Sequence, residues 1–186
     1  MSSSATVIKP VKPAITLSSL GQIHPTTLAP LLLDPEQSTK LAVIDVRDSD
    51  HIGGNINGST WIPINQLDAR MPELLRTLKD KDRVIFHCML SQQRGPKAAL
   101  MYARAKRSAE DKAEAEAAKT AATQSEGSEE KPSDGNVDGI DKKNKSGTDA
   151  SPPQEVCVLE GGFGWWQSRY GPDPRLTANY EADIWV

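Results

Sequence analysis

The residues best suited to chemistry are a cysteine and an arginine at the two ends of a seven-residue loop. Cys88 directly follows Arg83 to His87 (RVIFH), a run of β-branched and aromatic residues that is typical of a buried strand. Arg94 is followed by Gly95 and Pro96, which favour the first turn of a helix. A loop between a strand and a helix N-terminus can wrap its N–H groups around a tetrahedral oxyanion, and it favours a cysteine thiolate. The sequence therefore predicts a nucleophile beside an oxyanion cradle.

We expect Cys88 and Arg94 to be the catalytic residues of this site, because a thiolate attacks and a guanidinium donates two parallel hydrogen bonds. The phosphate-binding loop is predicted to consist of Met89, Leu90, Ser91, Gln92, Gln93 and Arg94. The alternative is that Cys88 is a small buried side chain, as cysteines often are. The coincidence of strand, Cys, spaced Arg, Gly and helix favours the reactive thiol.

The second cysteine has the opposite surroundings. Cys157 lies in Glu155 to Leu159 (EVCVL), flanked by valines with no cation nearby, so we expect a packed strand residue rather than a resolving thiol. Two cysteines cannot make the disulfide framework of a secreted protein. The three histidines, His24, His51 and His87, lack the spacing of metal ligands. We therefore expect neither a metal nor a resident cofactor.

The surrounding elements predict an α/β domain, a mostly parallel sheet flanked by helices. Buried strands are expected at Leu41–Val46, Arg83–His87 and Glu155–Leu159, with a short strand at Ser59–Ile62 and a weak one at Ala14–Ser18. Helices are expected at His24–Leu33 and Asn65–Lys79, and after Gly95.

The ends and the middle of the chain differ in composition from these elements. Residues 1–13 predict a disordered tail. In residues 104–153 the large apolar residues are Val137 and Ile140 alone, which predicts an insert within a single domain spanning 14–185. The Ala-, Lys- and Glu-rich part, 104–124, favours a helix that prolongs the preceding one into solvent. Residues 125–153 favour a flexible loop.

Charge and hydropathy exclude several classes of partner. The formal net charge is −3 and no long basic run is present, so nucleic-acid binding is not expected. No apolar stretch approaches the ~20 residues that span a bilayer, and the first residues lack the apolar centre of a secretory signal. We expect a cytoplasmic protein, with the nucleus as a second compartment, and leave its oligomeric state open.

Three segments resemble one known family. The run HCMLSQQRGP, residues 87–96, resembles the active-site loop of the rhodanese-like dual-specificity phosphatases, the family of the M-phase inducer phosphatases, and above all that of their small fungal and plant members. Val43–Arg47 (VIDVR), with the turn at 54–59 (GNINGS), resembles the strand end and Gly-rich turn of rhodanese domains, although Asn55 replaces the usual His. Residues 158–166 (VLEGGFGWW) resemble the last strand and its following helix. The resemblance covers about 15–170 apart from the insert.

This resemblance implies a single rhodanese-like domain and a reaction. Sulfurtransferases of the rhodanese family have a loop one residue shorter. The seven residues from Cys88 through Arg94 match instead the loop length that suits phosphate or arsenate. The implied activity is hydrolysis of phosphotyrosine through a phosphocysteine, with phosphoserine and phosphothreonine as further substrates. The first alternative is an arsenate reductase that uses glutathione or glutaredoxin as the second thiol, since fungal arsenate reductases resemble this loop. The second is a non-catalytic interaction module, against which the intact Cys and Arg argue.

Several side chains have two interpretations. The loop offers no general acid; Asp45 could approach the site from its strand end, or be tied to Arg47 or to backbone amides. His87 is a second supporting candidate. Ser91 could help the thiolate to leave, or face solvent. The pair Trp165 and Trp166 could clamp a substrate, but such a pair is more often part core and part surface.

Overall fold

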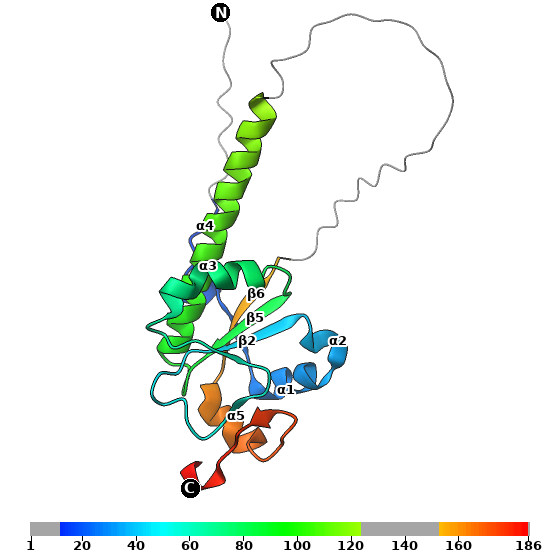
Figure 1. The fold of residues 1–186 in the computed structure, drawn as a ribbon, viewed down its shortest axis with the longest axis vertical. Helices are drawn as coiled ribbons and strands as arrows, with labels where there is room; N and C mark the ends of the chain where they lie inside the picture. The colour runs from blue at the N-terminus through cyan, green and yellow to red at the C-terminus, as the bar shows by residue number, and fades with distance from the viewer. Residues whose placement is uncertain (1–11, 124–152, 186) are drawn as a thin grey trace, which may run out of the picture.

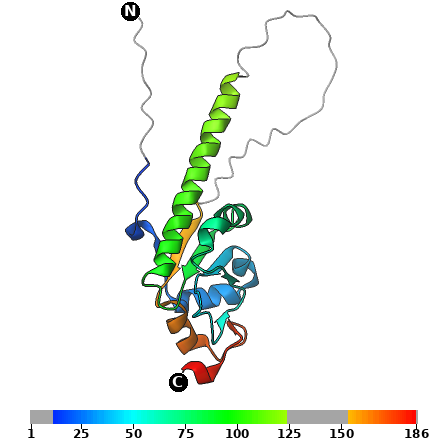
Figure 2. The same cartoon turned by 60° about the vertical axis from the view of Figure 1, so that its left-hand side comes forward.

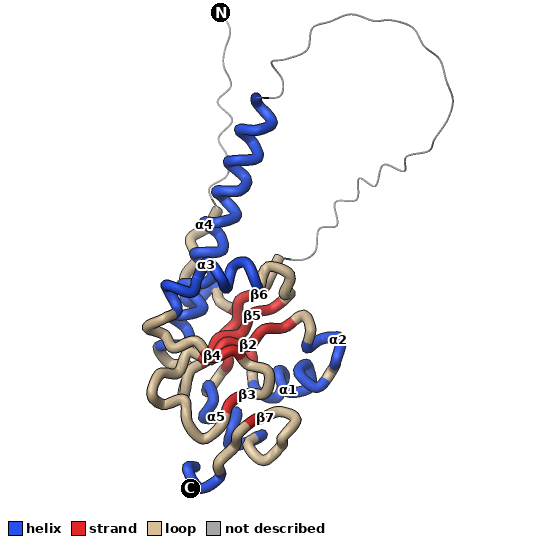
Figure 3. Tube along the Cα trace, viewed as in Figure 1, coloured by secondary structure: helices blue, strands red, loops and turns tan. Residues whose placement is uncertain are grey.

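Five parallel strands form the central sheet of the molecule. The computed structural model describes residues 12–123 and 153–185. The sheet order is β1 (Gly21–Ile23), β6 (Glu155–Leu159), β5 (Arg83–His87), β2 (Leu41–Asp45) and β4 (Thr60–Trp61), with every neighbouring pair parallel. β5 lies in the middle, between β6 and β2 (Figure 3). Its residues are in register with those of β2 from Leu41↔Arg83 to Asp45↔His87. The carboxyl ends of parallel strands meet at one edge, so the segments after β2 and β5 are brought together there.

Alternate residues of the central strands pack into two hydrophobic cores, one on each face of the sheet. Ile44, Val84 and Phe86 join the core beneath α3 (Leu67–Thr77) and α4 (Arg94–Thr123). Val43 and Ile85 join the core beneath α1 (Pro25–Leu33) and α5 (Gly162–Tyr170). Strands that are apolar on both sides are expected in a sheet covered on both faces. The predicted α/β architecture is confirmed.

Shorter elements complete the fold. They are η1 (Leu17–Ser19), α2 (Pro35–Ser38), η2 (Ala182–Trp185), and a two-stranded antiparallel sheet of β3 (Asn55–Ile56) and β7 (Thr177–Ala178). The predicted strands at 41–46, 59–62, 83–87 and 155–159 and the helices at 24–33 and 65–79 are confirmed within two residues at each end. α1 begins after His24, whose ring Nδ1 accepts a hydrogen bond from the Thr26 amide at 3.2 Å, with Pro25 as the first helical residue.

The weak strand predicted at Ala14–Ser18 is wrong. Ser19 ties this segment into a 3₁₀ turn, because its Oγ donates to the Thr16 carbonyl at 2.8 Å and accepts from the Thr16 amide at 3.0 Å. The edge strand begins instead at Gly21, opposite Cys157. A Cβ at Gly21 would lie 2.7 Å from the Cys157 sulfur, so the close pairing of β1 with β6 requires glycine at this position.

α4 covers the sheet with its first half and projects beyond it with its second, as Figures 1 and 2 show from two directions. Ala98, Ala99 and Tyr102 are buried, whereas the side chains from Ser108 to Thr120 are exposed. The prediction that residues 104–124 prolong the helix into solvent is confirmed as far as Thr123. Most of the predicted tail (1–13) and loop (125–153) lies outside the described residues. Within the described part of the chain, no helix could span a membrane.

Candidate active site

The loop from Cys88 to Arg94 connects the carboxyl end of β5 to the first turn of α4. The Ser91 amide donates a hydrogen bond to the Cys88 sulfur at 3.2 Å. Ser91 has a left-handed backbone (φ 52°), which turns the loop around the sulfur. Cys88 is 3% exposed. The Cys88 sulfur therefore lies at the N-terminal end of α4 with one loop amide bonded to it.

α5 holds the outer side of this loop. The amides of Phe163 and Gly164 donate to the carbonyls of Cys88 and Met89 at 2.9 and 2.8 Å. Gly162, with φ 57°, makes this approach possible, because a Cβ there would lie 2.5 Å from the Cys88 carbonyl oxygen. The first two carbonyls of the loop are thereby bonded to α5. Residues 158–166, which resemble the family's last strand and the helix after it, therefore help to shape the loop.

The loop amides are available to a ligand. Among the described residues, the amides of Met89, Leu90, Gln92, Gln93 and Arg94 have no hydrogen-bond acceptor. A run of backbone N–H groups with no protein acceptor at a helix N-terminus is the arrangement that binds anions. These are five of the six residues that the sequence predicted for the phosphate-binding loop; the amide of the sixth, Ser91, is bonded to the Cys88 sulfur.

Arg94 forms ion pairs with two carboxylates on the segment after β2. Its Nη1 donates to Asp50 Oδ1 at 2.6 Å and to Asp48 Oδ2 at 3.2 Å, and its Nη2 donates to Asp50 Oδ2. The hydrogen bonds from Arg94 lower the pKa of Asp50 to about 2, and the carboxylates raise the pKa of Arg94 above its usual range. All three side chains are about one-third exposed. The candidate catalytic arginine is therefore anchored before any ligand arrives.

Asp45 is tied to Arg47, so the structure favours the second of its two interpretations. The Arg47 amide donates to Asp45 Oδ1 at 3.0 Å, and the Arg47 guanidinium forms a fork on the same carboxylate, with Nη2 2.6 Å from Oδ2. Both side chains are fully buried. A carboxylate that is occupied in this way is a structural counter-ion rather than a general acid.

His87 and His51 flank the same Asp45 carboxylate, with Nε2 atoms 3.8 and 3.5 Å from Oδ2. Burial lowers the pKa of both histidines, most directly that of the fully buried His87, in spite of the nearby carboxylate. His87 Nδ1 lies 3.2 Å from the Cys88 carbonyl. His87, the last residue of β5, therefore supports the start of the loop as a neutral ring.

The remaining ambiguous side chains have definite places. Ser91 Oγ is buried, with no hydrogen-bond partner among the described residues, so a solvent-facing hydroxyl is excluded. Trp166 is fully buried and Trp165 is 55% exposed, which confirms the part-core, part-surface interpretation.

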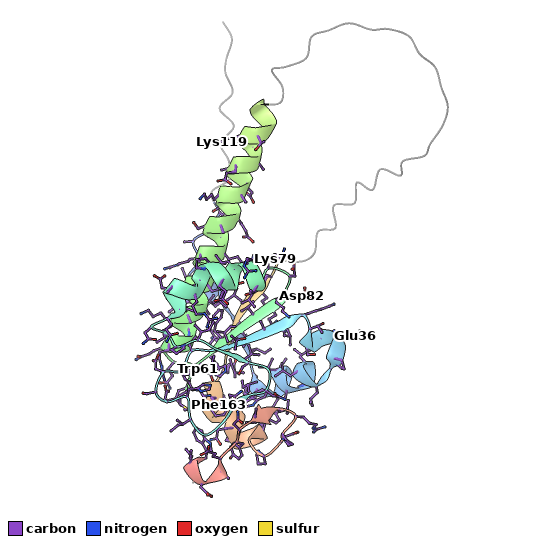
Figure 4. The ribbon with its side chains drawn as sticks, in the orientation of Figure 1. Glu36, Trp61, Lys79, Asp82, Lys119 and Phe163 are labelled. Carbon is purple, nitrogen blue, oxygen red and sulfur yellow. The ribbon has the colours of Figure 1, made fainter. Side chains whose placement is uncertain are left out.

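Trp61 and Phe163 lie at the end of the sheet away from the projecting half of α4 (Figure 4). Both contact Arg47: the Trp61 indole donates to its carbonyl at 2.8 Å, and its guanidinium carbon lies 4.1 Å from the centre of the Phe163 ring.

Sequence reasoning missed Asp48 and Asp50. They lie 46 and 44 residues before Arg94 and belong to no recognisable motif. The available signal was their position: they follow β2, whose carboxyl end adjoins that of β5. Acidic residues directly after a strand beside the loop strand were therefore candidates for contact with Arg94.

Comparison with known proteins identifies relatives of the whole chain. No family model matches the sequence. The CDC25-like phosphatase YCH1 of Saccharomyces cerevisiae is 32% identical over 184 residues, which cover 91% of this chain and 97% of that protein. This chain belongs to the Cdc25-like phosphatase family. The family resemblance predicted from the loop is confirmed.

Solved structures of this family's fold agree with the comparison. Ygr203w, a yeast protein tyrosine phosphatase of the rhodanese family, has a TM-score of 0.59 and 28% identity, covering 93% of this chain and all of that chain. The As-Sb reductase of Leishmania major has a TM-score of 0.58 and 26% identity, covering 86% of this chain and 85% of that one. A phosphatase and an As-Sb reductase therefore share the rhodanese fold of this chain.

Proposed function

We propose that this chain is a cysteine-dependent phosphatase that hydrolyses phosphotyrosine, with phosphoserine and phosphothreonine as further substrates. The observation that carries the proposal is the Cys88 sulfur beside free loop amides, with Arg94 across the same loop. Such a cradle matches a phosphoryl group, whose three equatorial oxygens need donors while sulfur attacks phosphorus. The names of the relatives support the same reaction class.

In the proposed reaction the Cys88 thiolate attacks phosphorus. A sulfur–phosphorus bond forms, the phosphorus–oxygen ester bond breaks, and the released alkoxide or phenolate takes a proton from water. Arg94 and the loop amides bind the equatorial oxygens. Water then attacks the phosphocysteine and releases inorganic phosphate, which regenerates the thiolate. The reaction requires neither a metal nor a resident cofactor.

The test is release of phosphate from p-nitrophenyl phosphate and from phosphotyrosine, phosphoserine and phosphothreonine peptides by the purified chain. Turnover of the aryl phosphate that disappears in Cys88→Ser supports the proposal. Turnover that persists in this variant contradicts the role of Cys88. Comparison of the three peptides decides dual specificity. A chain that hydrolyses none of these substrates is not a phosphatase.

A second candidate function is reduction of arsenate, supported by the similarity to the Leishmania reductase. The place of Cys157 decides which thiol could take part in it. Cys157 packs in the core on the α1 and α5 face of the sheet, and burial raises the pKa of its thiol to about 12. It cannot serve as the resolving thiolate near neutral pH. An external thiol such as glutathione would have to supply the electrons.

In that reaction the Cys88 thiolate would displace one arsenate oxygen as water and form a sulfur–arsenic bond. Glutathione would then attack the Cys88 sulfur, and arsenic would leave as arsenite with the two electrons. The resulting mixed disulfide would be reduced by a further thiol, such as glutaredoxin. Arsenate-dependent oxidation of NADPH, coupled through glutathione and glutaredoxin, measures this activity. Cys157→Ala should leave it unchanged.

The proposed nucleophile also bears on location. A thiolate stays reduced in the cytoplasm and nucleus, where glutathione and thioredoxin act, and these are the compartments we propose. Fluorescence microscopy of a tagged full-length chain tests this. The oxyanion or phosphoprotein is the proposed partner; a purely non-catalytic interaction module would show neither of the two activities.

A further inference from the structure

The hydrogen bonds of Arg94 use three of its donors and leave two. A guanidinium carries five N–H groups, two on each Nη and one on Nε. Asp48 and Asp50 accept from Nη1, and Asp50 also accepts from Nη2. Among the described residues, Nε and the second hydrogen of Nη2 have no acceptor. Asp50 thus binds the end of the guanidinium, where the two Nη groups lie side by side.

The two remaining donors lie on one edge of the guanidinium plane. The Nε hydrogen and the Nη2 hydrogen on the same side, which is not bonded to Asp50, point in the same direction. Their spacing matches two oxygens of a carboxylate or a phosphate. An oxyanion could therefore take two parallel hydrogen bonds from Arg94 while Asp50 keeps its own two. Asp50 therefore does not have to release Arg94 when the oxyanion binds.

We infer that Asp50 is the positioning residue for Arg94: it holds the end of the guanidinium so that the Nε edge is presented to the oxyanion above Cys88. This inference rests on the proposed function. It assigns Asp48 a smaller part, since Asp48 contributes one bond of 3.2 Å, against the two bonds from Asp50. Fixing the side chain in advance removes the ordering of a long, flexible arginine from the cost of binding.

The opposite outcome has an equally clear physical basis. Asp48 and Asp50 bring two negative charges near a site for an anion, and their removal would strengthen anion binding if charge repulsion dominated. Positioning and repulsion therefore predict changes of opposite sign for the same substitution. A direct binding measurement separates them.

The experiment measures binding of inorganic phosphate by isothermal titration calorimetry, at fixed pH and ionic strength, to the full-length wild-type chain, Asp50→Asn, Arg94→Ala and the double variant. We expect Asp50→Asn to raise Kd about tenfold, and to change Kd less than about twofold in the Arg94→Ala background. Asp48→Asn should raise Kd no more than about threefold. Asp173→Asn removes a carboxylate from an ion pair with the exposed Arg175, outside the loop and the segment after β2, and is the matched control, with unchanged Kd.

Each other result overturns the inference. Tighter phosphate binding by Asp50→Asn would show that Asp50 repels the oxyanion. An equal loss in the Arg94→Ala background would show that Asp50 does not act through Arg94. If Asp50→Asn fails to fold by near-ultraviolet circular dichroism, Asp50→Glu decides, since a retained carboxylate should keep most of the affinity. A loss as large as that of Arg94→Ala would refute positioning by the carboxylate.

The same variants separate this inference from the proposed function. Phosphate binding needs no turnover, so a wild-type chain that binds phosphate through Arg94 and Asp50 but hydrolyses no ester would refute the phosphatase and retain the positioning role. A chain that hydrolyses p-nitrophenyl phosphate with the same kcat and KM after Asp50→Asn would retain the phosphatase and refute the positioning role. A wild-type chain that neither binds phosphate nor hydrolyses p-nitrophenyl phosphate refutes both.

Discussion

The Arg47 guanidinium forms a fork on the Asp45 carboxylate inside the protein, with both side chains fully buried. The same guanidinium donates to the Gly54 carbonyl at 2.8 Å and covers the Phe163 ring. One buried ion pair thus joins the end of β2, the Gly-rich turn and α5. Because α5 holds the loop carbonyls, this pair supports the active site from a distance.

The first prediction is that Asp45→Asn destabilises the fold. Loss of the carboxylate leaves the Arg47 charge buried without its counter-ion, which should lower the free energy of unfolding by about 3 to 5 kcal/mol. Urea unfolding followed by fluorescence measures the change. At a temperature where the variant is folded, substantial phosphatase activity should remain. A stable but inactive variant would instead return Asp45 to the list of possible general acids.

Asp173→Asn provides the comparison for this measurement. Its partner Arg175 is 70% exposed, and exposed pairs contribute little to stability. Its unfolding midpoint should match that of the wild-type chain. Equal midpoints for Asp45→Asn and Asp173→Asn would mean that the buried pair does not hold the three segments together.

The second prediction concerns the two cysteines. Cys88→Ser should lower kcat for p-nitrophenyl phosphate by at least about 10³-fold, because a hydroxyl without a base is a poor nucleophile. Cys157→Ala should keep the activity, since Cys157 is buried on the other face of the sheet. Initial rates of both variants at equal concentration give the answer. Comparable losses in both would mark a redox pair, and about a tenth of the activity left in Cys88→Ser would remove Cys88 from the mechanism.

The third prediction is that Arg94→Lys loses activity although it keeps the charge. A lysine ammonium cannot make the two bonds with Asp50 and two more with the oxyanion, so kcat/KM should fall on the order of 10²-fold. Steady-state kinetics with p-nitrophenyl phosphate measures the loss. A rate equal to that of the wild-type chain would show that charge alone suffices at this position.

Some elements of the fold could be predicted from the sequence and others could not, for physical reasons. Val84 to Phe86 and Val156 to Val158 are apolar on both sides, and such runs identify buried strands without knowledge of their partners. β1 was missed because its identity depends on Gly21 meeting the Cys157 sulfur, a contact between residues 136 positions apart in the numbering. Its three residues carry no periodic pattern of their own.

In the site, too, residues close together in the sequence could be predicted, and residues brought together only by the fold could not. Cys88, the loop and Arg94 are contiguous, so their spacing alone predicts an oxyanion cradle. Asp48 and Asp50 act through tertiary contacts with Arg94, and nothing in their spacing distinguishes them from solvated loop carboxylates. The fork between Asp45 and Arg47 was one of two alternatives from the sequence, and burial decided between them.

The fourth prediction is that stability falls as the pH is lowered below about 6.5. Burial lowers the pKa of His87 and of His51 in the folded chain, so the unfolded chain binds more protons in this range. Stability therefore rises with pH through the window below the unfolded histidine pKa of about 6.5 and is fully present above it. Thermal unfolding from pH 8 to pH 5 should show a falling midpoint, and His87→Gln should flatten the dependence. A midpoint that rises on acidification would contradict neutral buried histidines.

The last prediction tests the proposed domain boundaries. Tyr102 Oη donates to Gln154 Oε1 at 3.0 Å, and Gln154 Nε2 donates to the Leu78 carbonyl at 2.6 Å, so the packed part of α4 ends close to the start of β6. A Gly-Ser linker replacing residues 108–152 can therefore span the gap. Loop-closure free energy changes by only about 0.6 kcal/mol per doubling of length, so the unfolding midpoint should stay the same or rise slightly.

Activity distinguishes the possible roles of the removed segment. The cradle from Cys88 to Arg94 precedes it, so kcat/KM for p-nitrophenyl phosphate should be retained in the shortened chain. A loss confined to phosphoprotein substrates would make the segment a recognition element, which its charged, serine-containing composition would suit. An unfolded chain, or a folded one that fails on the small substrate, would place the segment in the core or the site and refute the boundaries, because neither Tyr102 nor Gln154 would then suffice to close the domain.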